Sequence, residues 1–129
     1  MNRVLIDTSV WIEFFKANPL YFETFLDVID RAQIFSIELI FAELMQGAKG
    51  KREIEMIDRF FGQMIILDSP GLIYQAGIFS RENKLLDRGI GLIDSIIIST
   101  SISLDLEIWT LDKKILGFVD KKYVFSGFR

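Results

Sequence analysis

Short apolar runs rich in β-branched residues alternate along this chain with longer segments whose apolar residues recur at helical spacing. The runs that are typical of strands cover residues 4–6, 33–35, 64–67, 107–110 and 123–125. Strands that alternate with helices are typical of parallel sheets, because each helix carries the chain back across a face of the sheet. The pattern therefore predicts an α/β protein, a three-layer α/β/α sandwich with a mostly parallel central sheet.

The segments between these runs predict helices over about 9–15, 20–31, 37–47, 51–61, 69–86 and 92–104, with a short helix after 112. Several begin with a side chain suited to cap a helix, and the expected caps are Thr8 or Ser9, Ser36 and Ser69. Segment 92–104 contains three consecutive isoleucines that favour a strand, but its length and the strand after it favour a helix. A length of 129 residues fits one domain over 1–129.

The chain contains no histidine and no cysteine. Their absence excludes Ser-His-Asp and Cys-His catalysis, the usual zinc sites and a disulfide framework. If the chain is an enzyme, then carboxylates, hydroxyls, lysines or a metal ion must carry the chemistry. No stretch long enough to cross a bilayer is free of charge, and the start lacks the build of a signal peptide, so we expect a cytoplasmic location without membrane contact.

Four carboxylates occupy positions that suit a functional site, either at the end of a predicted strand or within an apolar helical stretch where an acid is unexpected. Asp7 and Asp112 follow predicted strands, and Glu43 and Asp94 interrupt apolar helical stretches. A buried lone carboxylate is costly, and several together repel one another unless a cation compensates them. Hard divalent ions prefer oxygen ligands, so the set favours Mg²⁺ or Mn²⁺ and metal-assisted hydrolysis of a phosphodiester.

Each of these acids also has an ordinary structural explanation. Asp7 and Asp94 could cap the helices that follow them, Asp112 could be a turn residue, and Glu43 could pair with an arginine. These explanations are sufficient for any one acid taken singly. The occurrence of all four in one short chain favours a shared site.

Four motifs contain these acids, namely residues 6–12 (IDTSVWI), 42–44 (AEL) with Gly47, 88–94 (RGIGLID) and 110–112 (TLD). In their order and spacing they resemble the successive motifs of the PIN-domain ribonucleases. Within that family, the chain is most similar to the VapC-type toxins of bacterial and archaeal toxin–antitoxin pairs. The resemblance covers nearly the whole chain and implies a single PIN-like domain over 1–129.

The resemblance implies an Mg²⁺- or Mn²⁺-dependent endoribonuclease with an acidic catalytic and metal-binding site. Asp7 and Asp94 would then be the principal metal ligands, while Glu43 and Asp112 would complete the cluster or hold metal-bound waters. Supporting hydroxyls would come from three residues, Thr8, Ser9 and Thr110. The resemblance further implies an RNA substrate, a homodimer, and a cognate antitoxin that buries a segment near the active site.

The chain departs from the family pattern at two positions. Ser99 stands where a small alanine is common after the third acid, and Lys114 stands near the fourth acid where some relatives carry another carboxylate. The lysine leaves open whether the site holds one metal ion or two.

A net charge of −3 is unusual for a protein that binds nucleic acid. Several basic residues nevertheless lie next to the motifs, and Arg88, Lys113 and Lys114 are the candidates for contacting RNA phosphates. Any one of them could instead be a solvated residue at a helix end.

Two other functions compete with the nuclease. A non-catalytic module with the same fold could bind RNA or protein, and a phosphatase of the haloacid-dehalogenase type also begins with an aspartate after its first strand. That phosphatase uses a second aspartate two residues later, where this chain has Ser9. P-loop and dinucleotide-binding sites are excluded because no glycine-rich loop follows a strand.

Overall fold

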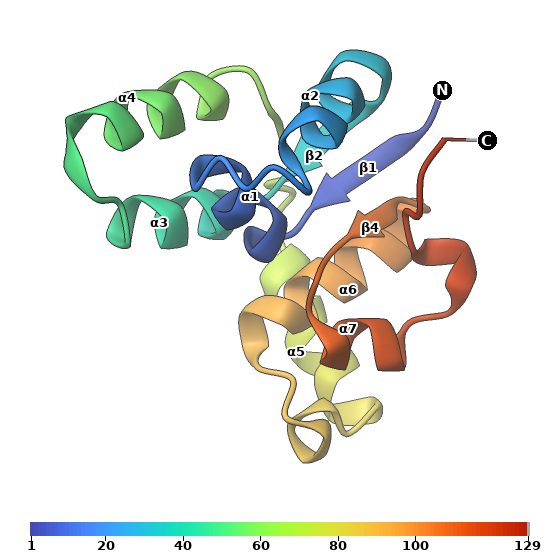
Figure 1. Cartoon of the computed structure of the whole chain (residues 1–129). Helices are drawn as coiled ribbons and strands as arrows, with labels where there is room; N and C mark the ends of the chain where they lie inside the picture. Colours follow the sequence, from blue (N-terminus) through green and yellow to red (C-terminus); the bar gives the residue numbers. More distant parts are fainter. Residues whose placement is uncertain (129) are drawn as a thin grey trace.

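Four parallel strands form the centre of the structure, a computed structural model that describes residues 1–128 (Figure 1). They are β1 (Arg3–Ile6), β2 (Gln33–Ser36), β3 (Ile65–Ile66) and β4 (Glu107–Trp109), and their order across the sheet is β3-β2-β1-β4. Every pairing is parallel. The predicted α/β class with a parallel central sheet is therefore confirmed.

The central strand β1 is buried on both faces. Val4, Leu5 and Ile6 are inaccessible to solvent, and Val4 is paired with Ile34 of β2 on one side and with Glu107 of β4 on the other. Strands of a parallel sheet with helices on both faces consist of such continuous apolar runs. The residue that follows β1 is therefore delivered to the carboxyl edge in the middle of the sheet.

Within residues 1–128, seven α-helices connect the strands and cover the sheet. Those before β3 are α1 (Thr8–Phe15), α2 (Phe22–Arg31), α3 (Glu38–Gln46) and α4 (Gly50–Phe61); those after it are α5 (Leu72–Glu82), α6 (Leu92–Leu104) and α7 (Lys113–Phe118). The first group lies on one side of the sheet and α5 and α6 on the other, which completes the three layers (Figure 1). Within residues 1–128, no helix has the length and apolar character needed to cross a membrane.

The structure breaks the helix that was predicted over 69–86. α5 ends at Glu82, and a separate 3₁₀ turn, η1 (Leu85–Arg88), follows it. The residues on either side of η1 have left-handed backbone conformations, with φ of 52° at Lys84 and 74° at Gly89. An α-helix cannot continue through such residues. α5 therefore ends before Lys84, and η1 is part of the short connection that leads to α6.

The strand that was predicted over 123–125 is largely absent. A 3₁₀ turn, η2 (Lys121–Tyr123), occupies its start, and the Asp120 side chain caps this turn by accepting a hydrogen bond from the Lys122 N–H at 3.1 Å. Only Val124 forms a bridge, to Ile108 of β4. The local cap therefore prevails over the strand propensity of this segment.

The expected caps of three helices are also wrong. α1 begins after Asp7, α3 after Ile37 and α5 after Gly71, and none of these residues makes a side-chain capping bond. Thr8 and Ser9 instead direct their hydroxyls to carboxylates. The sequence thus located these helices to within a few residues but assigned wrong roles to the hydroxyls at their starts.

An aromatic cluster joins the helices on the α1 side of the sheet. The Trp11 ring lies 4.9 Å from that of Phe25, 5.1 Å from Phe41 and 5.4 Å from Phe60, measured between centroids. Phe25 also stacks on Phe14 at 4.0 Å. These contacts connect α1 to α2, α3 and α4, so the cluster holds the helix that follows Asp7 in place.

Replacement of Phe25 by alanine should lower the free energy of unfolding by about 3–5 kcal/mol, because a fully buried ring in a dense cluster leaves a cavity. Chemical denaturation followed by circular dichroism measures this loss. The control is Leu20→Ala, at a residue that is 79% exposed, which should change the stability by less than about 0.5 kcal/mol. Equal losses in the two variants would contradict the packing described here.

Candidate active site

The carboxyl ends of β1 and β4 meet at Asp7. The Asp7 N–H donates a hydrogen bond to the Trp109 carbonyl at 2.9 Å, which extends the pairing of the two strands by one residue. Asp7 is 4% exposed, although it carries a carboxylate. Thr110 follows β4 at the same edge and is also buried. The parallel pairing therefore brings together two motifs that are about a hundred residues apart in the sequence.

Two hydroxyls hold the Asp7 carboxylate in a fixed orientation. Ser9 Oγ and Thr110 Oγ1 both donate to Asp7 Oδ2, at 2.8 and 2.7 Å. Each hydroxyl in turn accepts a backbone N–H at 3.0 Å, Ser9 from Leu111 and Thr110 from Asp112. Because a hydroxyl has a single proton to donate, both protons are committed to Oδ2. The other oxygen, Oδ1, has no hydrogen-bond partner within residues 1–128 and is available to a ligand.

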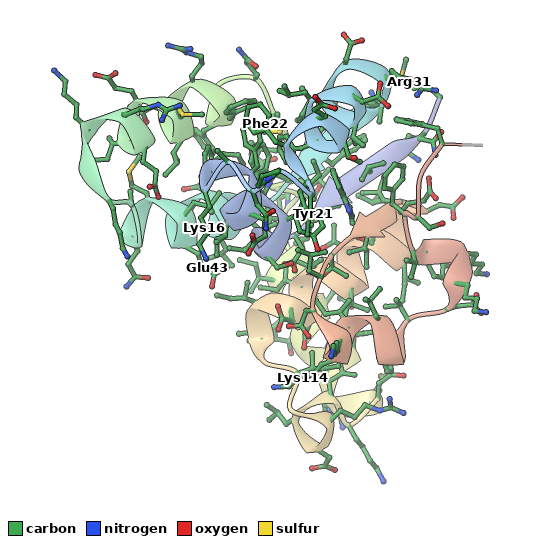
Figure 2. All side chains as sticks on the ribbon, viewed as in Figure 1. Lys16, Tyr21, Phe22, Arg31, Glu43 and Lys114 are labelled. Carbon is green, nitrogen blue, oxygen red and sulfur yellow. The ribbon has the colours of Figure 1, made fainter. Side chains whose placement is uncertain are left out.

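Glu43 is brought to the same edge by α3. Thr8 Oγ1, at the start of α1, donates to Glu43 Oε1 at 3.0 Å. Glu43 interrupts an apolar helical stretch in the sequence, but it does not face the core, because Ile40 and Leu44 are buried and Glu43 is exposed. Figure 2 shows the Glu43 side chain on α3. The alternative pairing with an arginine is not seen within residues 1–128.

Asp94 lies in the first turn of α6 and is half-buried. Its helix is capped by Gly91, so the alternative interpretation of Asp94 as a cap is wrong. Burial, together with the negative charges of Asp7, Asp112 and Glu43, raises the pKa of Asp94 to about 6. The fold has therefore gathered the four predicted acids into one region where they repel one another.

Asp112 combines a structural role with its place in this cluster. It is the N-cap of α7, and its Oδ1 accepts a hydrogen bond from the Lys114 N–H at 2.8 Å. The alternative interpretation of Asp112 as a turn residue is thus correct in part. Its charge nevertheless acts on Asp94, as the raised pKa of Asp94 indicates.

The residues present fit a hard divalent cation by their chemistry. All the candidate donors are oxygens, and none of the four carboxylates forms an ion pair with a lysine or arginine of residues 1–128. In that described part of the chain, no group of three or more acidic side chains is arranged to hold one ion as it stands. Mg²⁺ commonly uses one or two carboxylates and keeps several waters, so two acids are a sufficient protein contribution.

Two of the three candidate RNA-binding residues lie at the contact between η1 and α7. The Arg88 guanidinium lies 5.1 Å from the centre of the Phe118 ring, and Lys114 Nζ donates to the Gly89 carbonyl at 3.3 Å. Lys113 is exposed in the first turn of α7. All three residues therefore belong to η1 and α7, the two elements that flank α6 and Asp112 in the sequence.

Sequence reasoning missed the main-chain part of the site. The N–H groups of Leu111 and Asp112 fix the two hydroxyls that orient Asp7, and no side-chain pattern signals such donors. Ser99 lies elsewhere, beside Thr100 over a cavity of about 180 Å³ whose lining includes none of the four acids. The departure from the family pattern at Ser99 thus does not alter the acidic cluster directly.

The raised pKa of Asp94 predicts how the stability of the metal-free protein depends on pH. An acid whose pKa rises from 3.8 to about 6 on folding binds more protons in the folded state, so the free energy of unfolding should fall as pH increases from about 4 to 6. Because Asp94 is only half-buried, solvent screening reduces this loss to the order of 1 kcal/mol.

Urea unfolding of Asp94→Asn in EDTA measures this contribution, because the variant should lose the downward slope and be more stable than the wild type at pH 7. The exposed Asp105 supplies a matched control, Asp105→Asn, which should keep the slope. If the stability of Asp94→Asn falls with pH as steeply as that of the wild type, then the Asp94 carboxylate does not cause the pH dependence.

Comparison with known proteins supports the assignment of the fold. The family model described as PIN domain matches residues 4–121. No curated protein matches the chain significantly. Among solved structures, the chain has a TM-score of 0.70 and 20% identity to a chain of VapBC2 from Rickettsia felis, bound to a DNA fragment from its promoter, with coverage of 95% of this chain and 96% of that one.

Two further structures have the same fold at similarly low identity. A toxin–antitoxin complex from Klebsiella pneumoniae gives a TM-score of 0.72 at 19% identity, covering 95% of this chain and 99% of that one. VapBC-1 from nontypeable Haemophilus influenzae gives 0.67 at 18%, covering 89% and 90%. The family model extends over all four acids, from the strand before Asp7 to the helix after Asp112. The chain therefore belongs to the PIN-domain family.

Proposed function

We propose that this protein is an Mg²⁺- or Mn²⁺-dependent endoribonuclease that hydrolyses RNA phosphodiester bonds. The observation that carries the proposal is the gathering of Asp7, Glu43, Asp94 and Asp112 at one edge of the sheet without a compensating ion pair in residues 1–128. Natural proteins rarely keep such repulsion unless a ligand relieves it. A divalent cation is the ligand that matches a set of oxygen donors.

In this proposal Asp7 and Asp94 contribute the direct metal contacts. Asp7 Oδ1 is the free oxygen of a carboxylate whose orientation is already fixed, and burial and the neighbouring acids raise the pKa of Asp94. Glu43 and Asp112 complete the cluster or hold water around the cation. The bound ion would supply Lewis-acid activation of water and of the phosphate.

The three hydroxyls act as positioning groups. Ser9 and Thr110 orient Asp7, and Thr8 restrains the exposed side chain of Glu43. Groups that hold metal ligands in this way affect metal affinity about as strongly as many ligands do. Arg88, Lys113 and Lys114 bind the phosphates of the RNA beside the acidic cluster.

The biological role that we propose is the toxin of a toxin–antitoxin pair. The support is the shared fold with chains from complexes whose descriptions name VapBC or a toxin and an antitoxin. The corresponding partners are a cognate antitoxin and a second copy of this chain, and the proposed location is the cytoplasm. Purification of the protein with the product of the neighbouring gene, followed by mass measurement of the complex, tests this role.

The competing function is a PIN-fold module that binds RNA or protein without cutting. One observation favours it, namely that no three acids in residues 1–128 stand ready to hold an ion together. The phosphatase alternative has no such support, because Ser9 occupies the position of the second aspartate and holds Asp7 by a hydrogen bond. Metal-dependent cleavage distinguishes the nuclease from the binding module.

Purified wild-type protein should cut a mixed pool of RNA in Mg²⁺ or Mn²⁺ and should not cut it in EDTA. Asp7→Asn and Asp94→Asn should each lower the rate by about a hundredfold or more, because each removes a charged metal ligand. Asp105→Asn makes the same change in an exposed acid next to the start of β4, at the opposite edge of the sheet, and should cut normally. Unchanged cleavage in both site variants would refute the site assignment.

Thr110→Val should weaken Mn²⁺ binding by about 10- to 100-fold, because it removes the hydroxyl that orients Asp7 while keeping the shape of the side chain. Isothermal titration calorimetry measures this affinity. Thr24→Val changes an exposed threonine of α2 and serves as the control. If Thr110→Val binds Mn²⁺ as tightly as the wild type, then the hydroxyl does not support a metal ligand.

A further inference from the structure

Lys114 places a positive charge beside the acidic cluster. It is the second residue of α7, and its backbone N–H is already bound to Asp112 Oδ1. Its charge acts on Asp94 in opposition to the three neighbouring acids. Figure 2 shows Lys114 at the start of α7, close to the loop that leads into α6.

The ammonium group of Lys114 lies against Gly89, the residue that follows η1. The Lys114 side chain runs over this glycine, and a Cβ at position 89 would lie 3.4 Å from Nζ and 3.5 Å from Cε. Gly89 also has a φ of 74°, which a larger residue adopts only with strain. Contacts at these distances are ordinary van der Waals contacts, so the backbone conformation is what favours glycine here, and the Gly89 carbonyl accepts a hydrogen bond from Nζ at 3.3 Å.

The ammonium group is restrained but not neutralised. It can donate three hydrogen bonds, and its one bond in the described part of the chain goes to a neutral carbonyl at a long distance. No carboxylate of residues 1–128 lies within ion-pair distance of it, although its charge acts on Asp94. A lysine whose role was to stabilise the cluster would be expected to pair with one of them.

The charge balance of the site favours a role for Lys114 in binding phosphate. A single divalent cation would not neutralise four carboxylates, and an RNA phosphate approaching them would still be repelled. Position 114 also offers no oxygen ligand for a second ion. A fixed ammonium with free donors at the rim of the cluster compensates the phosphate charge without a second ion.

We propose that the Lys114 ammonium binds a non-bridging oxygen of the RNA phosphate at the cleavage site and provides part of the charge compensation that a second metal ion would supply. This inference rests on the proposed nuclease function. In the hydrolysis, the oxygen of one water bonds to phosphorus, the bond from phosphorus to the leaving sugar oxygen breaks, and a proton of the water ends on that oxygen. Lys114 forms no covalent bond and transfers no proton.

The first test measures RNA binding in EDTA, where no cleavage occurs. Fluorescence anisotropy of a labelled mixed-sequence RNA gives the slope of log affinity against log salt concentration, and Lys114→Met should make this slope shallower by about 0.7, the value for one lost phosphate contact to a single strand. Lys114→Arg should keep the wild-type slope because it keeps the charge. The control Lys122→Met removes a lysine that lies near Met1 and Glu107, at the opposite edge of the sheet, and should leave the slope unchanged.

The second test separates phosphate binding from metal binding. In Mg²⁺, Lys114→Met should cut RNA about 10- to 100-fold more slowly, and Lys114→Arg should recover part of the rate. Calorimetry with Mn²⁺ alone should show unchanged or tighter binding in Lys114→Met, since a cation next to the ligands has been removed. Weaker Mn²⁺ binding in Lys114→Met would overturn the inference, because the lysine would then act on the metal ligands.

Two further outcomes also overturn the inference. In the first, Lys114→Met keeps the salt dependence of RNA binding and the cleavage rate of the wild type. In the second, Lys114→Met and Lys114→Arg both lose thermal stability and activity, which would mean that Lys114 acts only through its hydrogen bond to Gly89. If the wild type cuts RNA in either case, then only this inference fails. A wild type that neither cuts nor binds RNA would refute the proposed function together with the inference.

Discussion

The hydrogen bonds around Asp7 are the constraint on which the acidic site depends. The Asp7 N–H joins the ends of β1 and β4, and its carboxylate accepts one hydroxyl from its own motif and one from Thr110. Both hydroxyls are fixed by backbone N–H groups of the segment after β4. The orientation of the acid is therefore set by strand pairing and by main-chain donors, and these persist without a ligand.

The arrangement of the other acids limits the cost of gathering like charges. Glu43 is exposed, Asp112 is partly satisfied by its capping bond, and Asp7 is buried with two hydrogen-bond donors. Burial and the charges of Asp7, Asp112 and Glu43 raise the pKa of Asp94 to about 6. The apolar sheet and the aromatic cluster around Trp11 supply the stability that offsets this local strain. A site of this kind becomes more stable when a cation binds to it.

How far the sequence could predict the molecule differs from element to element. The parallel sheet and the four acids follow from the alternation of segments and from carboxylates where none is expected, and the structure has the sheet and brings the acids together. The prediction of a strand over 123–125 was wrong because the Asp120 cap stabilises a turn there. The prediction of one helix over 69–86 was wrong because Lys84 adopts a left-handed conformation. Both differences arise from backbone conformation at single residues, which propensity averaged over a segment does not resolve.

By itself, the sequence determined the chemistry that this protein can perform. The absence of histidine and cysteine and the presence of Asp7, Glu43, Asp94 and Asp112 restrict the candidate site to oxygen ligands. Tertiary structure alone decided which oxygen of Asp7 is free, that burial and neighbouring acids raise the pKa of Asp94, and that Lys114 lies against Gly89 without a carboxylate partner in residues 1–128. The physical reason is that these properties depend on the pairing of β1 with β4 and on the turn before α6, which bring residues distant in the chain within a few ångströms.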